Sequence, residues 1–195
     1  MNNELVLQFS TCAAPAHWWE IDWSKWIRRA GHSPFSHVDL MMDDGNLLGA
    51  SNSPGSPIIA GNASGVALRP QDYLAPYGGF AYRRRMVLAT TRAHDIRAIT
   101  LTQLGKPFDG NMIRDMLGDK FPGVRDWRLG DSWRCSELIG WGMETGGFWG
   151  GNLNWPKNKL SPTDLCLVLI ADRRWINSDT FWAPIPGLEL GPKEH

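Results

Sequence analysis

The sequence predicts a single domain of the α+β class. Segments with strand-like alternation or an apolar, β-rich composition dominate the part of the chain before residue 90, whereas most helical spacings follow it. No repeat, linker or low-complexity tract divides the 195 residues. We therefore expect one domain over residues 1–195. The predicted strands are residues 5–9, 37–42, 47–50, 65–69 and 83–90.

The most sharply defined local prediction is a β-hairpin. Asp43-Asp44-Gly45-Asn46 is a strong turn sequence, and an apolar segment lies on each side of it, residues 37–42 and 47–50. After the hairpin, residues 51–65 are rich in Ser, Asn, Gly and Pro and are predicted to form a loop.

The helices are predicted from apolar spacing and from capping residues. Trp19, Trp23 and Trp26 fall at helical spacing, so residues 4–30 are expected to hold a strand and a Trp-rich helix that ends near Arg29. Ser161-Pro-Thr-Asp carries an N-cap serine, a proline at the first helical position and an acidic residue three positions on, which predicts a helix start. The other predicted helices are residues 92–104, 109–117 and 132–144.

Composition excludes several classes of protein. Lys and Arg (20) balance Asp and Glu (20), so no overall charge favours nucleic acid or an anionic membrane, and no nucleic-acid partner is expected. Eleven Trp argue against disorder because each indole offers a large area to bury. The N-terminus reads as a strand and not as a signal peptide, and the longest apolar run, residues 165–171, is too short to span a bilayer.

Cys135 is the leading candidate for a nucleophile. Cys12, Cys135 and Cys166 lie far apart, so a disulfide framework is not expected. Cys135 falls in the first turn of a predicted helix, where the helix dipole favours a thiolate, and Arg134 would act in the same direction. His37 opens the best predicted strand and could serve as its base. The alternative is that Cys135 is an inert core cysteine.

Other patterns carry weaker hypotheses. Cys166 lies in an apolar run and is expected in the core. A zinc site built from Cys12, His17, His32 and His37 matches no common spacing, so no metal and no cofactor are expected. The run from Arg83 to Arg85 is expected to be a solvated strand edge protected by charge rather than a phosphate site.

A set of motifs around these two residues resembles a known family. Ser-Pro-Phe-Ser-His37-Val-Asp-Leu is followed by Gly45-Asn-Leu-Leu-Gly-Ala and Gly65-Val-Ala-Leu-Arg-Pro, and later by Gln103-Leu-Gly-Lys-Pro-Phe-Asp, Trp133-Arg-Cys-Ser-Glu-Leu-Ile and Ser161-Pro-Thr-Asp-Leu. In this order, over about residues 33–170, they resemble the circularly permuted papain-like cysteine hydrolases. These form the YiiX-like branch related to NlpC enzymes and to lecithin retinol acyltransferase, found in bacteria and phages. Residues 171–195 would be a C-terminal extension.

The resemblance implies a fold and a set of roles. It implies an antiparallel sheet packed against a helix that bears Cys135 as nucleophile, with His37 as general base and backbone N–H groups at the helix start as oxyanion donors. The family's third polar residue falls on Gly49, which has no side chain. Asp39 shares the strand face of His37 and is the tentative third member, and Ser51 is the other candidate.

Three functions remain open at this point. The first is hydrolysis of an amide bond, possibly in peptidoglycan peptides, through an acyl-enzyme. The second is hydrolysis or transfer of an acyl lipid or acyl thioester by the same dyad. The third is a non-catalytic binding or phage structural protein that keeps the fold, a hypothesis motivated by Gly49. Trp127, Trp133, Trp149 and Trp155 flank the Cys135 helix and could wall a substrate cleft. The expected location is cytoplasmic or virion-associated, and no prediction of oligomeric state is made.

Overall fold

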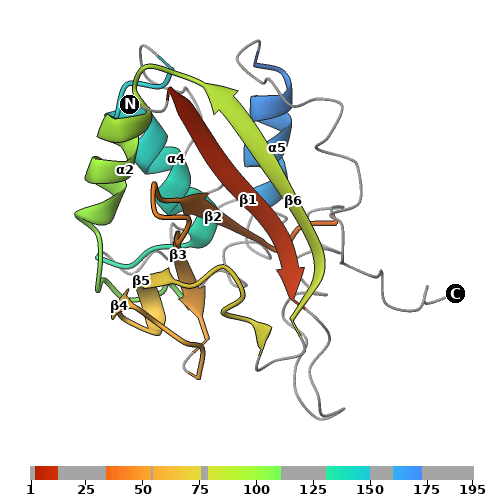
Figure 1. The fold of residues 1–195 in the computed structure, drawn as a ribbon, viewed down its shortest axis with the longest axis vertical. Coiled ribbons are helices and arrows are strands. Elements are labelled where there is room, and N and C mark those ends of the chain that lie inside the picture. The colour runs from red at the N-terminus through yellow and green to blue at the C-terminus, as the bar shows by residue number, and fades with distance from the viewer. Residues whose placement is uncertain are drawn as a thin grey trace, which may run out of the picture.

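The computed structural model confirms the α+β class. It describes residues 3–12, 34–53, 55–75, 79–110, 131–149 and 160–172. Within these ranges the chain forms an antiparallel sheet of six strands and three helices (Figure 1). The strands are β1 (Glu4–Cys12), β2 (His37–Met41), β3 (Leu47–Asn52), β4 (Ala60–Gly61), β5 (Ser64–Arg69) and β6 (Phe80–Ala89), and the helices are α2 (Ala93–Leu101), α4 (Cys135–Thr145) and α5 (Pro162–Ile170).

The strands lie in the order β4-β5-β3-β2-β1-β6. β1 is therefore internal and pairs with the hairpin strand β2 on one side and with the long strand β6 on the other. Its register places Gln8 opposite Asp39 and Ser10 opposite His37. Because neighbours across a ladder share a face of the sheet, these four side chains lie on one face.

The predicted hairpin of β2 and β3 is confirmed. Gly45 adopts a φ of 84°, which a residue with a side chain rarely takes, and the Asn46 N–H donates to the Asp44 carboxylate at 2.9 Å. The turn closes with a bond of 2.8 Å from the Met42 N–H to the Asn46 carbonyl. The pairing of Leu40 with Leu48 then fixes which residues of β3 face which residues of β2.

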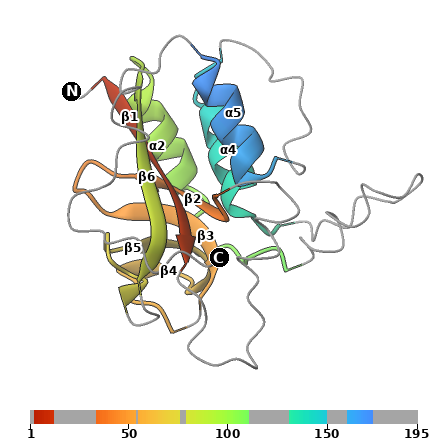
Figure 2. The same cartoon turned by 90° about the vertical axis from the view of Figure 1, so that its right-hand side faces the viewer.

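The helices pack on the apolar face of the sheet. Figure 1 shows α5 partly behind β6, and Figure 2 shows α4 and α5 together on one side of β1 and β6. α2 and α4 approach closely at Gly142, where an added Cβ would lie 2.0 Å from Thr100 Oγ1. The buried core between sheet and helices includes Leu5, Leu7, Phe9, Val38, Leu40, Met86, Leu88, Ile96, Ile139, Met143, Leu165 and Leu169.

α5 begins at the capping box that the sequence predicts. Ser161 accepts a bond of 3.1 Å from the Asp164 N–H, and the Asp164 carboxylate accepts one of 2.9 Å from the Ser161 N–H. Within the residues that the structure describes, no helix is long and apolar enough to cross a membrane.

Several expectations need correction. β6 begins at Phe80, three residues before its predicted start, and β4 lies inside the segment predicted as a loop. Arg84 is not a solvated edge residue, because it is buried with its guanidinium 4.2 Å from the centre of the Tyr82 ring. The Trp-rich helix and residues 173–195 of the C-terminal extension lie outside the described residues. So does the helix predicted over 109–117 except for residues 109 and 110, which are not helical.

Candidate active site

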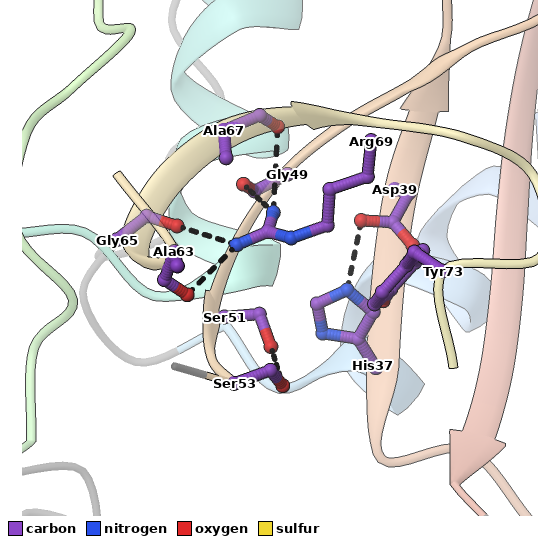
Figure 3. Close-up of polar contacts among 10 residues, drawn as sticks. All are labelled: His37, Asp39, Gly49, Ser51, Ser53, Ala63, Gly65, Ala67, Arg69 and Tyr73. Atoms are coloured by element: carbon purple, nitrogen blue, oxygen red, sulfur yellow. Dashed lines mark hydrogen bonds and ion pairs between the residues drawn. The ribbon is translucent and has the colours of Figure 1, made fainter. Parts of the chain in front are cut away.

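His37 and Asp39 form a buried pair on one face of β2. Residues two apart in a strand point to the same side, and here the His37 Nε2 lies 2.8 Å from Asp39 Oδ1 (Figure 3). A carboxylate can only accept, so the hydrogen of this bond belongs to Nε2. Nδ1 is then the ring nitrogen left to exchange a proton with another group.

Tyr73 supports the far side of the same carboxylate. Its hydroxyl donates to Asp39 Oδ2 at 3.3 Å, and the tyrosine is buried beside the apolar side chains of Leu47 and Leu74. Asp39 is thus contacted by His37 through one oxygen and by Tyr73 through the other. A carboxylate held at both oxygens has a fixed orientation, which in turn fixes the plane of the His37 ring.

Gly49 lies beside this carboxylate on β3. A Cβ built on Gly49 would lie 2.0 Å from Asp39 Oδ1 and 3.1 Å from Asp39 Cγ. The space that a side chain at position 49 would fill therefore holds the Asp39 carboxylate. The structure gives Gly49 a steric reason to be glycine, and the polar group next to His37 comes from β2.

Arg69 fixes the backbone behind Gly49. Its buried guanidinium donates to the Gly49 carbonyl at 2.9 Å and to three other carbonyls (Figure 3). Its guanidinium carbon also lies 5.4 Å from the centre of the Tyr73 ring. The other acceptors are the carbonyls of Ala67, Ala63 and Gly65, at 3.3, 3.2 and 3.1 Å.

Cys135 is the first residue of α4, three residues after the predicted start of that helix. Backbone bonds explain the shift, because the Trp133 N–H donates to the Pro107 carbonyl and the Trp133 carbonyl accepts from the Asp109 N–H, both at 3.0 Å. The residues before the helix are therefore held in an extended bridge. As a result, Cys135 sits at the N-terminal end of the helix dipole rather than one turn inside.

A buried ion pair anchors this helix start. Arg134, the N-cap residue, directs Nε and Nη2 at Asp109 Oδ2, each at 3.1 Å, and both side chains are buried. The expected direct effect of Arg134 on the thiol is not among the interactions that shift its pKa. The role that the geometry gives Arg134 is to hold the start of α4 against the segment around Asp109.

The electrostatics couple Cys135 to His37. Burial raises the pKa of the Cys135 thiol. The charge of His37, a hydrogen bond with its ring and a hydrogen bond with the Val38 backbone each lower that pKa. Asp39 acts in the opposite direction, and the net pKa lies below the ordinary 9.0. Burial lowers the pKa of His37, but the charges of Asp39 and Cys135 outweigh it and the pKa lies well above 6.5. Both shifts act in favour of a thiolate beside an imidazolium and against the neutral pair.

The remaining sequence candidates do not join this site. Ser51 Oγ bonds with Ser53 Oγ at 2.8 Å, so of the two candidates for third member only Asp39 is hydrogen-bonded to His37. Cys166 is buried in the core, and burial raises its pKa to about 12. In the described part of the chain no three His, Cys, Asp or Glu side chains form a metal cluster, while His17 and His32 lie outside it.

Two supporting residues were not predicted, and the Trp hypothesis is only partly testable. Tyr73 lies in a turn three residues after Pro70 and had no pattern that pointed to the site. Arg69 had a visible signal, a cation ending an apolar strand. Trp133 packs on Trp141 with ring centres 5.2 Å apart, and Trp149 packs on Phe148 at 5.3 Å. These contacts assign packing roles to the described rings. Trp127 and Trp155 lie outside the described residues.

Comparison with known proteins adds no identification. No protein-family model matches the chain, and no curated protein matches it significantly.

Proposed function

We propose that the protein is a cysteine hydrolase that cleaves an amide bond through an acyl-enzyme, with a circularly permuted papain-like fold. The observation that carries this proposal is the coupling of Cys135 to His37, in which the pKa of the thiol is lowered and that of the imidazole is raised. A structural cysteine in a core shows the opposite shift, as Cys166 does. A lowered thiol pKa favours the thiolate that attacks a carbonyl, and a proton donor beside it can protonate the leaving nitrogen.

The reaction follows from these groups. The Cys135 thiolate attacks the carbonyl carbon, and the C=O π pair moves to oxygen. The His37 imidazolium gives its proton to the leaving nitrogen as the C–N bond breaks, which leaves a thioester on Cys135. Neutral His37 then takes a proton from water and the hydroxide adds to the thioester carbonyl. The C–S bond breaks as the oxyanion re-forms C=O, which releases the carboxylic acid and leaves the Cys135 thiolate beside protonated His37.

The start of α4 supplies the oxyanion donors in this mechanism. The first N–H groups of a helix have no carbonyl acceptor within the helix, and Cys135 is the first helical residue. An oxyanion that forms on the carbon attacked by Sγ lies near these N–H groups and the positive end of the helix dipole.

The arrangement at position 49 weakens the case for a non-catalytic protein. That hypothesis rested on a missing polar side chain at Gly49, and the Asp39 carboxylate fills the space instead, 2.8 Å from His37 Nε2. The proposed substrate is a peptide-like amide, with peptidoglycan peptides as the first class to test. An acyl-lipid or acyl-thioester hydrolase would use the same dyad, so a substrate panel must separate it.

The test measures hydrolysis by the full chain. Muropeptides and peptide amides are compared with p-nitrophenyl esters of increasing chain length, for the wild type and for Cys135→Ala, His37→Ala and the matched control Cys166→Ala. We expect turnover of amides that both site variants abolish and the control retains. A preference for long acyl esters would instead indicate an acyl-lipid hydrolase that uses the same dyad. Turnover that persists in Cys135→Ala would refute the mechanism.

A further inference from the structure

We infer that Gly49 is a positioning residue of this site, and that the third carboxylate can be moved between positions 39 and 49. Asp39 can approach His37 because residue 49 has no side chain. The inference rests on the proposed function and extends it to a residue that touches neither nucleophile nor base. Its basis is the steric exclusion between a Cβ at 49 and Asp39 Oδ1, 2.0 Å apart.

Space, and not backbone conformation, requires glycine here. Gly49 does not have the left-handed φ that favours glycine, in contrast to Gly45 at 84°. Apart from Asp39, the nearest atom to the added Cβ is the Val38 carbonyl oxygen at 3.5 Å, an ordinary van der Waals contact. Removal of the Asp39 carboxylate therefore leaves room for a Cβ at position 49.

The strand around Gly49 cannot easily move away from such a side chain. Leu48 and Ala50 are fully buried on the other face, and Arg69 holds the Gly49 carbonyl at 2.9 Å. Glycine in a strand interior sacrifices packing and conformational entropy, so it persists where another group needs the space. A new side chain at 49 is thus expected to displace Asp39 rather than β3.

The same geometry predicts that a carboxylate can act from β3. A side chain on residue 49 begins 2.0 Å from Asp39 Oδ1, the atom that lies 2.8 Å from His37 Nε2. A carboxylate at 49 can therefore reach the same ring nitrogen once Asp39 is truncated. Position 39 or position 49 can supply the single carboxylate that accepts from His37 Nε2. Side chains at both positions would push Asp39 out of its present place.

The experiment uses four variants of the full chain: Gly49→Ala, Asp39→Ala, and the doubles of Asp39→Ala with Gly49→Asp or Gly49→Ala. The His37 pKa is measured by NMR, and amide turnover is measured on the best substrate of the panel. We expect each single variant to lower the His37 pKa and to reduce kcat at least about tenfold. The Gly49→Asp double should recover both, and the matched Gly49→Ala double should recover neither.

A stability measurement keeps the inference testable where a charged variant folds poorly. Gly49→Ala should lower Tm in the wild type but leave it unchanged or raise it in the Asp39→Ala background, because the clash is then absent. Additive Tm changes, or a wild-type His37 pKa in Gly49→Ala, would overturn the inference. So would a Gly49→Asp double that matches its Gly49→Ala partner. An unreactive Cys135 in the wild type would instead defeat the proposed function, which separates the two failures.

Discussion

The contrast between Cys135 and Cys166 gives a sharp quantitative prediction. At pH 7 a thiol with the ordinary pKa of 9.0 is about 1% thiolate. Cys135 must exceed this fraction because its pKa is lowered, whereas a pKa of about 12 leaves Cys166 about 10⁻⁵ ionised. The thiolate fraction of Cys135 is then at least about 10³ times that of Cys166. The more basic sulfur is the better nucleophile by roughly 15- to 30-fold over three pKa units, which leaves at least about a 30-fold advantage for Cys135.

The assay is timed alkylation of the native protein by iodoacetamide, with each cysteine followed by mass spectrometry from pH 5 to 9. The two side chains are about equally buried, at 5% and 3% exposure, so ionisation and not access should set the difference. The Cys135 rate should follow its lowered pKa and begin to level off at a lower pH than the rate of a thiol with the ordinary pKa of 9.0. The Cys166 rate should still increase about tenfold per pH unit at pH 9.

A variant of His37 tests the cause of this reactivity. His37→Ala removes the positive charge and the hydrogen bond that lower the Cys135 pKa, so the level part of its profile should move to higher pH. Equal labelling of Cys135 and Cys166 at pH 7 would refute the reasoning. A wild-type Cys135 rate that still increases about tenfold per pH unit at pH 9, as the Cys166 rate should, would refute it equally.

Three further predictions concern stability and are read from chemical denaturation. Asp109→Asn should lower the unfolding free energy by about 3–5 kcal/mol, because it leaves Arg134 charged and buried. It should also slow labelling of the cysteine at the helix start. A loss below about 1 kcal/mol would show that the pair does not anchor α4. Gly142→Ala should cost about 1–3 kcal/mol in the wild type and less beside Thr100→Ala, and equal costs would contradict the close helix contact. Ser161→Ala should cost about 1 kcal/mol through the lost capping box, and no loss would exclude a stabilising cap.

The local parts of the fold and the site were predictable from sequence. The hairpin followed from its turn, and the common face of His37 and Asp39 followed from the two-residue period of a strand. Counting across the turn also placed Gly49 at the position from which the resembled family's third polar residue orients the imidazole. These features depend only on neighbours along the chain or across a single tight turn, where pattern and geometry are closely linked.

The supporting contacts were not predictable, since they join segments with no shared period. Tyr73 reaches Asp39 from 34 positions away, after a strand and a turn of which only the strand was predicted. The start of α4 was misplaced because the bonds of Trp133 to the segment at Pro107 hold the chain extended where helix propensity continues. Tertiary hydrogen bonds therefore determined which residue came first in the helix.

The order of the chain has a consequence for folding. His37 and Cys135 are about 100 residues apart, and the first lies in a local hairpin while the second begins a late helix. Closing a loop of this length costs entropy that local contacts do not offset, so the helix can dock only on a sheet already formed. During synthesis the proton acceptor emerges well before the sulfur. The thiol pKa should therefore fall in the same step in which α4 docks. The alkylation rate of Cys135 during refolding would report when that step occurs.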